Sequence, residues 1–126
     1  RRADDGVVAA PLTADTRGLV GEEASGAMKP GAVFVNLGRG PVVVEAALVR
    51  ALAEGRLRGA ALDVFETEPL PAASPLWGMD NVLVSPHCAD NTPGWLEAAM
   101  RAFLANLERF RRGERLLNVV DKRLGY

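Results

Sequence analysis

Four short apolar runs, separated by helical stretches, constrain the fold of this 126-residue chain more than any other feature. The runs occupy residues 6–10, 32–37, 59–64 and 81–84, and each is followed by glycine, proline or a polar loop. Strands that alternate with helices are typical of a parallel sheet, and near-continuous apolar strands favour a sheet covered on both faces. The sequence therefore predicts an α/β fold.

Three helical stretches are predicted at about residues 22–28, 44–54 and 93–112. In the second, Leu48, Ala51 and Leu52 share one face, and Gly55 stands where a helix-ending glycine is expected. The third is the longest, and its apolar residues recur at steps of three and four. Thr92 followed by Pro93 predicts the cap and the first residue of this helix.

Composition excludes several classes of protein. No apolar run approaches the roughly 18 residues that cross a bilayer, which excludes a transmembrane protein. Fifteen basic and sixteen acidic residues give a net charge of −1, which argues against a nucleic-acid or anionic-membrane surface. The single cysteine, Cys88, cannot form an internal disulfide and fits a reducing, cytosolic setting. One histidine and one cysteine predict no metal site.

Ligands of open α/β sheets bind beyond the carboxyl ends of the strands. The segments at those ends supply an arginine, a histidine and several carboxylates, namely Arg39, His87, Asp63, Glu66 and Glu68. These side chains suit an anionic substrate and the transfer of one proton. From the residues alone, three structural interpretations remain open: Arg39 as a solvated residue of a tight turn, His87 as a structural or solvated residue, and the two glutamates as surface charges. Cys88 is interpreted as a packing residue.

Three of these segments, in order, resemble the D-isomer-specific 2-hydroxyacid dehydrogenases. They are VNLGRGPVVVE at 35–45, GAALDVFETEP at 59–69 and SPH at 85–87, supported by PLT at 11–13 and MKPGA at 28–32. The resemblance covers nearly the whole chain. It implies the second half of a Rossmann-type NAD(P)-binding domain at residues 1–112, including the long C-terminal helix at about 93–112, and a C-terminal tail at 113–126.

The resemblance implies a catalytic set of three residues. Arg39 would hold the substrate carboxylate and polarise the keto oxygen, a task that suits a guanidinium fork. His87 would donate the proton while a hydride arrives from the nicotinamide. Glu68 would be the partner of His87, because a nearby carboxylate favours the imidazolium form. The implied reaction interconverts 2-keto acids, such as glyoxylate or hydroxypyruvate, and D-2-hydroxy acids.

The same resemblance implies a site for NAD or NADP. Its expected residues are Ala10, Leu37, Gly38, Arg39, Asp63, His87, Ala89 and Asp90. Gly38 and Gly40 are expected to lack a side chain so that the dinucleotide can approach. Val44, Asp90 and Ala10 stand where the family commonly has aspartate, glycine and threonine, and Val44 is expected to alter the start of a helix.

The family's Gly-x-Gly-x-x-Gly turn, which seats the pyrophosphate, is not found in these residues. We therefore expect a fragment that lacks the residue selecting NAD or NADP. Half a sheet would leave an apolar edge at residues 7–10 or at 33–37, together with an open helix face. The isolated chain is accordingly expected to be poorly stable or to associate, and full activity of these 126 residues would contradict that expectation.

For the complete protein, the resemblance implies a cytoplasmic homodimer that takes a small 2-keto or 2-hydroxy acid and binds neither nucleic acid nor membrane. Two alternatives remain: a non-catalytic dinucleotide-binding protein of the corepressor kind, and an inactive truncated copy. The joint presence of Arg39, Glu68 and His87 favours the enzyme, because a binding module has little need for a charged pair.

Overall fold

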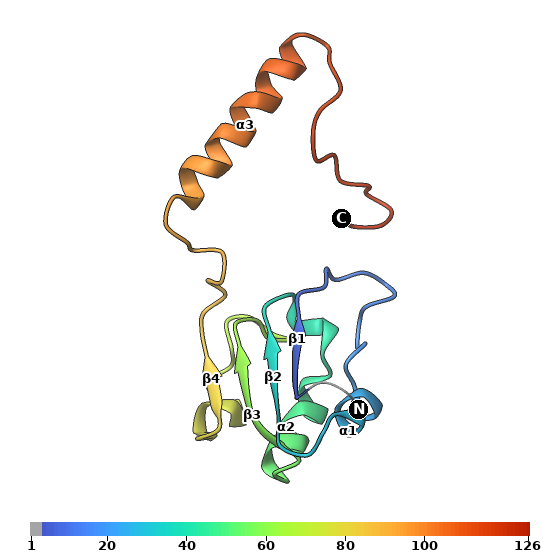
Figure 1. Ribbon diagram of the computed structural model, residues 1–126, viewed down its shortest axis with the longest axis vertical. Helices are drawn as coiled ribbons and strands as arrows, with labels where there is room; N and C mark the ends of the chain where they lie inside the picture. The colour runs from blue at the N-terminus through green and yellow to red at the C-terminus, as the bar shows by residue number, and fades with distance from the viewer. Residues whose placement is uncertain (1–3) are drawn as a thin grey trace. The chain divides into compact units, whose positions relative to one another are not determined.

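The computed structural model describes residues 4–126 and divides the chain after Cys88 into two compact units (Figure 1). The first contains, in order, β1 (Asp5–Val8), α1 (Glu22–Ala27), β2 (Ala32–Asn36), the 3-10 turn η1 (Gly40–Val42), α2 (Glu45–Ala53), β3 (Leu57–Leu62), the 3-10 turn η2 (Pro75–Gly78) and β4 (Val82–Val84). The second contains α3 (Trp95–Arg111) and the residues after it. The expected boundary at residue 112 falls inside the second unit.

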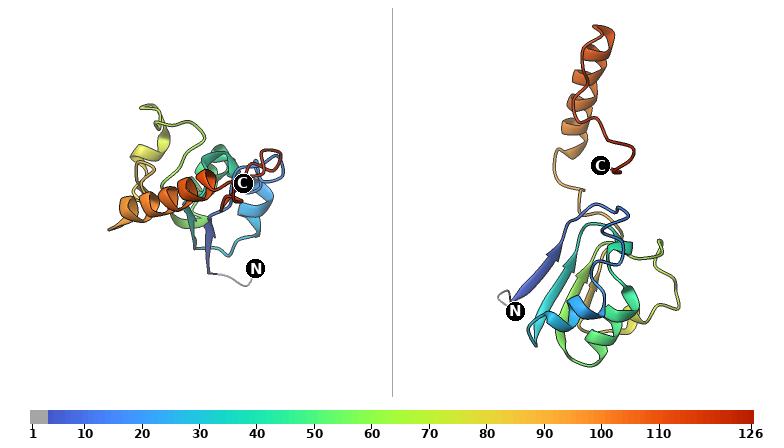
Figure 2. Two further views of the ribbon diagram at one scale, coloured as in Figure 1. Left: turned by 90° about the horizontal axis from the view of Figure 1, so that it is seen from above. Right: turned by 90° about the vertical axis from the view of Figure 1, so that its right-hand side faces the viewer.

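The four strands form one sheet in the order β1-β2-β3-β4, and every neighbouring pair is parallel. This confirms the predicted α/β fold with a parallel sheet. Helices α1 and α2 lie on the same face of the sheet (Figure 2). On that side Phe34 and Leu62 are buried together with Leu48 and Leu52 of α2 in one apolar cluster. Burial of a large apolar side chain contributes roughly 1.5–3 kcal/mol, so this cluster holds the first unit together.

The opposite face of the sheet carries an apolar row that crosses all four strands in register. Val7 pairs with Val35, Val35 with Ala61, and Ala61 with Leu83. Val7 and Leu83 are 65% and 74% exposed. Among the described strands β1 pairs only with β2, so an exposed apolar edge is confirmed at β1. The alternative at residues 33–37 is wrong, because β2 lies between two neighbours.

The N-terminus of α2 is capped by a residue from another loop, because Val44 has no polar side chain. Val44 is the cap residue, and its side chain makes no capping hydrogen bond. The Glu66 carboxylate, from the loop after β3, accepts the Glu45 N–H at 3.0 Å instead. The Glu45 carboxylate in turn accepts the Glu66 N–H at 3.2 Å. A carboxylate at a helix N-terminus is favourable, so the loop after β3 supplies the cap that Val44 cannot.

The start of α3 differs from the prediction by two residues. The helix begins at Trp95, because Gly94 has a φ of 79° and lies outside the helical region. The Thr92 carbonyl accepts the Trp95 N–H at 3.1 Å, so Thr92 and Pro93 belong to a turn before the helix.

No residue of α3 is buried, and its apolar stripe is exposed at Leu96, Met100, Phe103, Leu107 and Phe110. The expected open helix face is thus present within residues 4–126. None of the described helices is both long and apolar enough to span a bilayer.

Candidate active site

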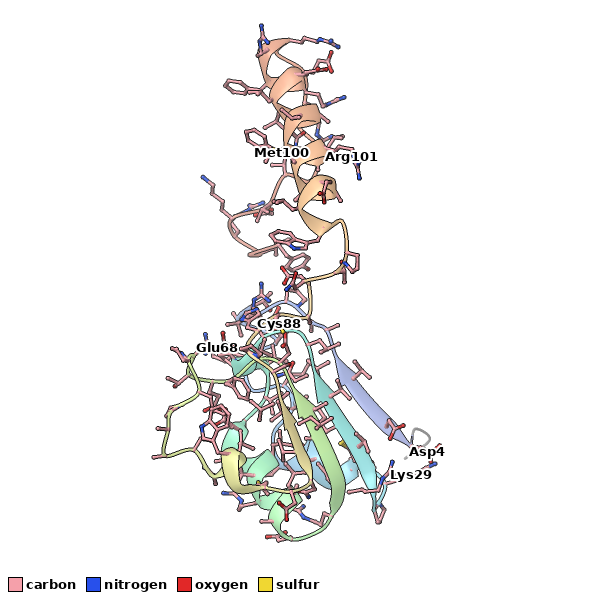
Figure 3. All side chains as sticks on the ribbon, turned by 90° about the vertical axis from the view of Figure 1, so that its left-hand side faces the viewer. Asp4, Lys29, Glu68, Cys88, Met100 and Arg101 are labelled. Carbon is pink, nitrogen blue, oxygen red and sulfur yellow. The ribbon has the colours of Figure 1, made fainter. Side chains whose placement is uncertain are left out.

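The predicted catalytic residues lie in the loops that follow β2, β3 and β4. Glu68 and Cys88 mark this end of the sheet in Figure 3, and the ion pair between Asp4 and Lys29 marks the other end. Because all four strands are parallel, their carboxyl ends share one edge. The general rule for ligands of such sheets therefore applies to the end that carries Glu68 and His87.

A buried amide shapes the turn that presents Arg39. Asn36, the last residue of β2, is 1% exposed. Its Oδ1 accepts the Gly38 N–H at 3.1 Å, and its Nδ2 donates to the Arg39 carbonyl at 3.3 Å. The Arg39 guanidinium also donates to the Gly38 carbonyl at 2.8 Å. We assigned Asn36 no role from the sequence, although a polar residue that ends an apolar strand is a signal for such a turn.

Two glycines let the loops touch one another. A Cβ on Gly40 would lie 1.7 Å from the Phe65 carbonyl oxygen, and one on Gly38 would lie 2.7 Å from the Ala10 carbonyl oxygen. We predicted that these glycines leave room for a dinucleotide. The structure gives a different reason, because the chain's own backbone fills the space. Gly40 thereby joins the turn of Arg39 to the loop that carries Glu68.

Replacing Gly40 with alanine is expected to lower the free energy of unfolding by about 3 kcal/mol, because two backbone segments must separate. The measurement is the urea midpoint of the complete protein that contains this chain. Gly78 provides the control, since an added Cβ there meets no atom within 4 Å. Equal stability of the G40A and G78A chains would show that the two loops are not in contact.

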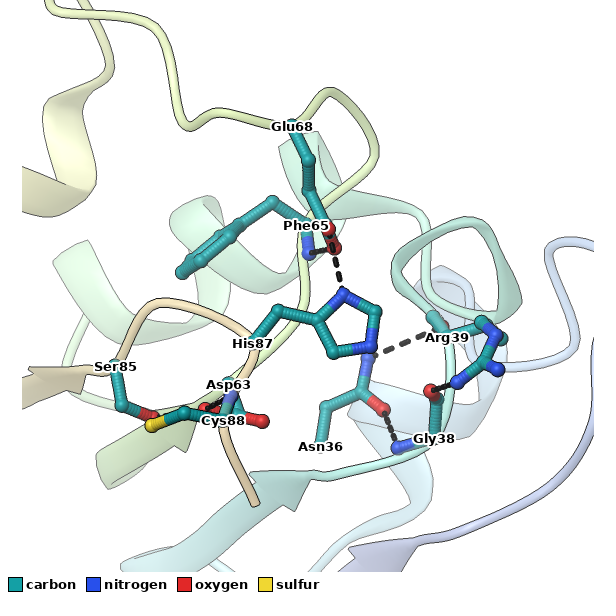
Figure 4. A network of polar contacts seen from close by, with 9 residues as sticks. All are labelled: Asn36, Gly38, Arg39, Asp63, Phe65, Glu68, Ser85, His87 and Cys88. Carbon is teal, nitrogen blue, oxygen red and sulfur yellow. Dashed lines mark hydrogen bonds and ion pairs between the residues drawn. The ribbon is translucent and has the colours of Figure 1, made fainter. Parts of the chain in front are cut away.

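The central feature of the site is an ion pair between residues 19 positions apart (Figure 4). The Nδ1 atom of His87 lies 2.7 Å from Oε2 of Glu68. The other oxygen of Glu68 accepts the Phe65 N–H at 3.0 Å, which fixes the carboxylate. A carboxylate at Nδ1 holds the proton on that nitrogen, so Nε2 is the atom that can exchange a proton with a ligand.

The pKa of Glu68 reflects this environment. Burial by itself raises the pKa of the carboxyl, but the hydrogen bonds with His87 and the Phe65 N–H lower it further than burial raises it. The charges of His87 and Arg39 act in the same direction. The net result is a pKa below the ordinary glutamate value, and the site therefore favours an ionised Glu68.

This shift predicts how the pair responds to acid. The stabilisation by Glu68 is complete above the ordinary glutamate pKa and is lost as the pH falls through the lowered value. A carbon-13 NMR titration of the complete protein that contains this chain is expected to show the Glu68 midpoint below the ordinary value, and H87A is expected to raise it. D80A, which removes an exposed carboxylate elsewhere, is the control. An unchanged midpoint in H87A would contradict the pairing.

Asp63 lies beneath the His87 loop. It is 2% exposed, and its Oδ1 accepts both the Ser85 hydroxyl and the Cys88 N–H, the latter at 3.0 Å. The family resemblance implies a place for Asp63 near the cofactor, and it assigns no role to Ser85. A hydroxyl two residues before the histidine was the available signal.

An open cavity of about 560 Å³ borders the ion pair. Besides Glu68 and His87, its walls are mainly apolar and consist of Phe65, Pro69, Leu70, Trp77, Val84, Ser85 and Pro86. Apolar surroundings strengthen an electrostatic interaction at their border, so this wall favours the pair.

The remaining predicted residues are placed as follows. Ala10 follows β1, and Leu37 follows β2 with 47% of its surface exposed. Ala89 and Asp90 belong to the second unit, so they are not part of the site geometry described for residues 4–88. Within residues 4–126, no three histidine, cysteine or acidic side chains are grouped as metal ligands would be.

Comparisons with known proteins agree with this geometry. Residues 1–89 match the family described as D-isomer specific 2-hydroxyacid dehydrogenase, NAD binding domain. Glyoxylate/hydroxypyruvate reductase B of Escherichia fergusonii is 52% identical over 82 residues, which are 65% of this chain and 25% of that protein.

Two solved structures resemble the chain closely. A D-isomer specific 2-hydroxyacid dehydrogenase from Xanthobacter autotrophicus, in complex with NADPH and MES, is 49% identical, with a TM-score of 0.91 over 98% of this chain and 50% of that one. An NADPH-dependent glyoxylate/hydroxypyruvate reductase from Sinorhizobium meliloti, in complex with NADP and sulfate, is 40% identical, with a TM-score of 0.90 over 99% of this chain and 40% of that one.

The chain thus spans half or less of the length of each of these relatives. The family match covers the sheet and all of Arg39, Glu68 and His87. Sequence match, parallel sheet and strand-end residues lead to the same assignment: the chain belongs to the D-isomer specific 2-hydroxyacid dehydrogenase family.

Proposed function

We propose that this chain supplies the catalytic half of an NAD(P)-dependent oxidoreductase that interconverts 2-keto acids and D-2-hydroxy acids. The observation that supports it most is the 2.7 Å contact between His87 and Glu68 at the carboxyl end of a parallel sheet. A histidine held by a carboxylate at one ring nitrogen can donate or accept a proton at the other.

His87 has the role of general acid in reduction. Its Nε2 proton passes to the carbonyl oxygen of the keto acid, and that oxygen becomes the hydroxyl. In the oxidation direction the same atom accepts the hydroxyl proton. Glu68 stays ionised throughout and favours the imidazolium that donates, which agrees with its lowered pKa.

Arg39 has the role of substrate anchor. Its guanidinium can engage both oxygens of the substrate carboxylate, which fixes the keto group relative to His87. Its charge is close enough to lower the pKa of Glu68, which supports a role for Arg39 beside the proposed proton donor. The turn braced by Asn36 limits where Arg39 can reach.

The residues at this edge fit a nicotinamide dinucleotide. The exposed side chain of Leu37 offers an apolar surface, the Gly38 and Ala10 backbones lie close together, and Asp63 is a buried hydrogen-bond acceptor nearby. These three features are suited to hold the nicotinamide end of NAD or NADP. When bound, the reduced cofactor supplies the hydride that the carbonyl carbon gains.

The proposed substrates are small 2-keto acids, with glyoxylate and hydroxypyruvate first, because two of the relatives are named as reductases of these acids. We also propose a cytoplasmic homodimer that binds neither nucleic acid nor membrane, in keeping with a net charge of −1. Light scattering of the complete protein tests the dimer.

The test of the activity joins this chain to the remainder of the Sinorhizobium meliloti enzyme, in place of the part it matches. We call this protein the chimera. It is expected to oxidise NADPH with glyoxylate or hydroxypyruvate at a rate within about tenfold of the parent enzyme. Some loss is expected because the two proteins are 40% identical, so some side-chain contacts across the junction will differ from those of the parent. A folded chimera that binds NADPH and turns over neither acid would contradict the proposal and favour a dinucleotide-binding protein.

A further inference from the structure

The backbone of His87 adopts a conformation that needs support. Its φ is 52°, in the left-handed region, which is uncommon for any residue other than glycine, although histidine adopts it more often than most. Such a conformation persists only where the surrounding structure determines it. The neighbours of His87 along the chain must therefore be held in place.

One oxygen atom holds a residue on each side of His87. Oδ1 of Asp63 accepts the Ser85 hydroxyl on one side of His87 and the Cys88 N–H at 3.0 Å on the other (Figure 4). Pro86, between them, has a fixed φ and restricts Ser85 as well. The four-residue loop thus has few conformations left.

Asp63 is itself fixed to the sheet. Its N–H donates to the Asn36 carbonyl at 3.1 Å, and the Ser85 N–H donates to the Leu62 carbonyl at 3.0 Å. These bonds continue the ladders between β2, β3 and β4 past the ends of the strands. The carboxylate is 2% exposed, and burial of a carboxylate is unfavourable unless it is hydrogen-bonded. Its position is therefore well determined.

We propose that Asp63 and Ser85 are positioning residues for His87: the buried carboxylate joins residues 85 and 88, and so directs the imidazole toward Glu68. This inference rests on the proposed function, but it concerns the geometry of this chain alone. It assigns to Asp63 a role toward the proton donor that is separate from any contact with a cofactor.

The variants separate the hydrogen bonds from cofactor contact. D63A removes the acceptor of both hydrogen bonds. S85A removes one of the two donors without altering Asp63, and S85T restores a hydroxyl. D80A serves as the matched control, because Asp80 is an exposed carboxylate just before β4.

In the chimera, D63A is expected to lower kcat for glyoxylate by about 100-fold, because a displacement of about 1 Å has an effect of that size. S85A, which loses a single hydrogen bond, is expected to lower kcat by up to about tenfold. The KM for glyoxylate is expected to change little in both. The alkaline limb of the kcat profile should move to lower pH in D63A and S85A, and S85T should keep the profile of the unsubstituted chimera.

A second readout requires no activity. In the chimera, D63A and S85A are expected to raise the carbon-13 NMR midpoint of Glu68 toward the ordinary glutamate value, as H87A does, while S85T and D80A leave it unchanged. If the chimera is inactive, only the proposed function is contradicted, and this titration still tests the positioning role. Unchanged kcat, pH profile and Glu68 midpoint in S85A, or an S85T variant as impaired as S85A, would overturn the inference.

Discussion

The H87A chimera is expected to reduce glyoxylate with a kcat lower by a factor of roughly 10² to 10⁴, the usual contribution of a positioned general acid. The reason is that His87 is the only histidine of the chain, so H87A removes its only imidazole. The affinity for NADPH, measured by fluorescence titration, is expected to stay within about twofold, because the change removes proton transfer rather than the binding surface.

The control for this experiment is D80A, which leaves the His87 pair intact. An H87A chimera that keeps full kcat would contradict the role of His87 as proton donor. Such a result, together with normal NADPH binding, would favour the dinucleotide-binding alternative that was left open on the sequence alone.

Replacing Arg39 with alanine has the second largest expected effect, a loss of about 10² to 10³ in kcat/KM for glyoxylate, which is typical of removing one electrostatic donor. R39K is expected to recover only part of this loss, because a lysine is a point charge and cannot engage a carboxylate with a planar fork. The measurement is the steady-state rate of the chimera as a function of glyoxylate concentration.

The matched control is R58A, which also removes one arginine, because Arg58 is exposed on β3. That variant is expected to behave like the unsubstituted chimera. An R39A chimera with the kcat/KM of R58A would show that Arg39 is a solvated turn residue, the structural interpretation that its sequence pattern had left open.

Much of the fold could be predicted because its signals are local. An apolar run such as residues 32–36 predicts the strand that it forms itself. Gly55 was predicted to end a helix, and it has a positive φ, 67°, as a helix-ending glycine commonly does. The parallel order of the strands follows from the alternation of strands and helices. The strand-end rule placed Arg39, Glu68 and His87 at one edge before any contact was visible.

What could not be predicted depends on contacts between distant segments. The carboxylate that caps α2 is Glu66, 21 residues away from its partner Glu45, and no local pattern points to it. The bonds from Asp63 to the Ser85 loop likewise join β3 to β4. At the start of α3, the local Thr-Pro pattern predicted a helix that begins at Pro93. This prediction was wrong, because Gly94 takes a left-handed conformation and the helix begins after it.

The most direct test of the central claim, that Glu68 and His87 act as one catalytic pair, is a double-mutant cycle of kcat in the chimera. E68A and H87A are compared with the variant that carries both. If the pair acts as a unit, the double variant is expected to match H87A within about twofold, because Glu68 has nothing left to act on. Losses that multiply in the double variant would contradict the pairing and the mechanism built on it.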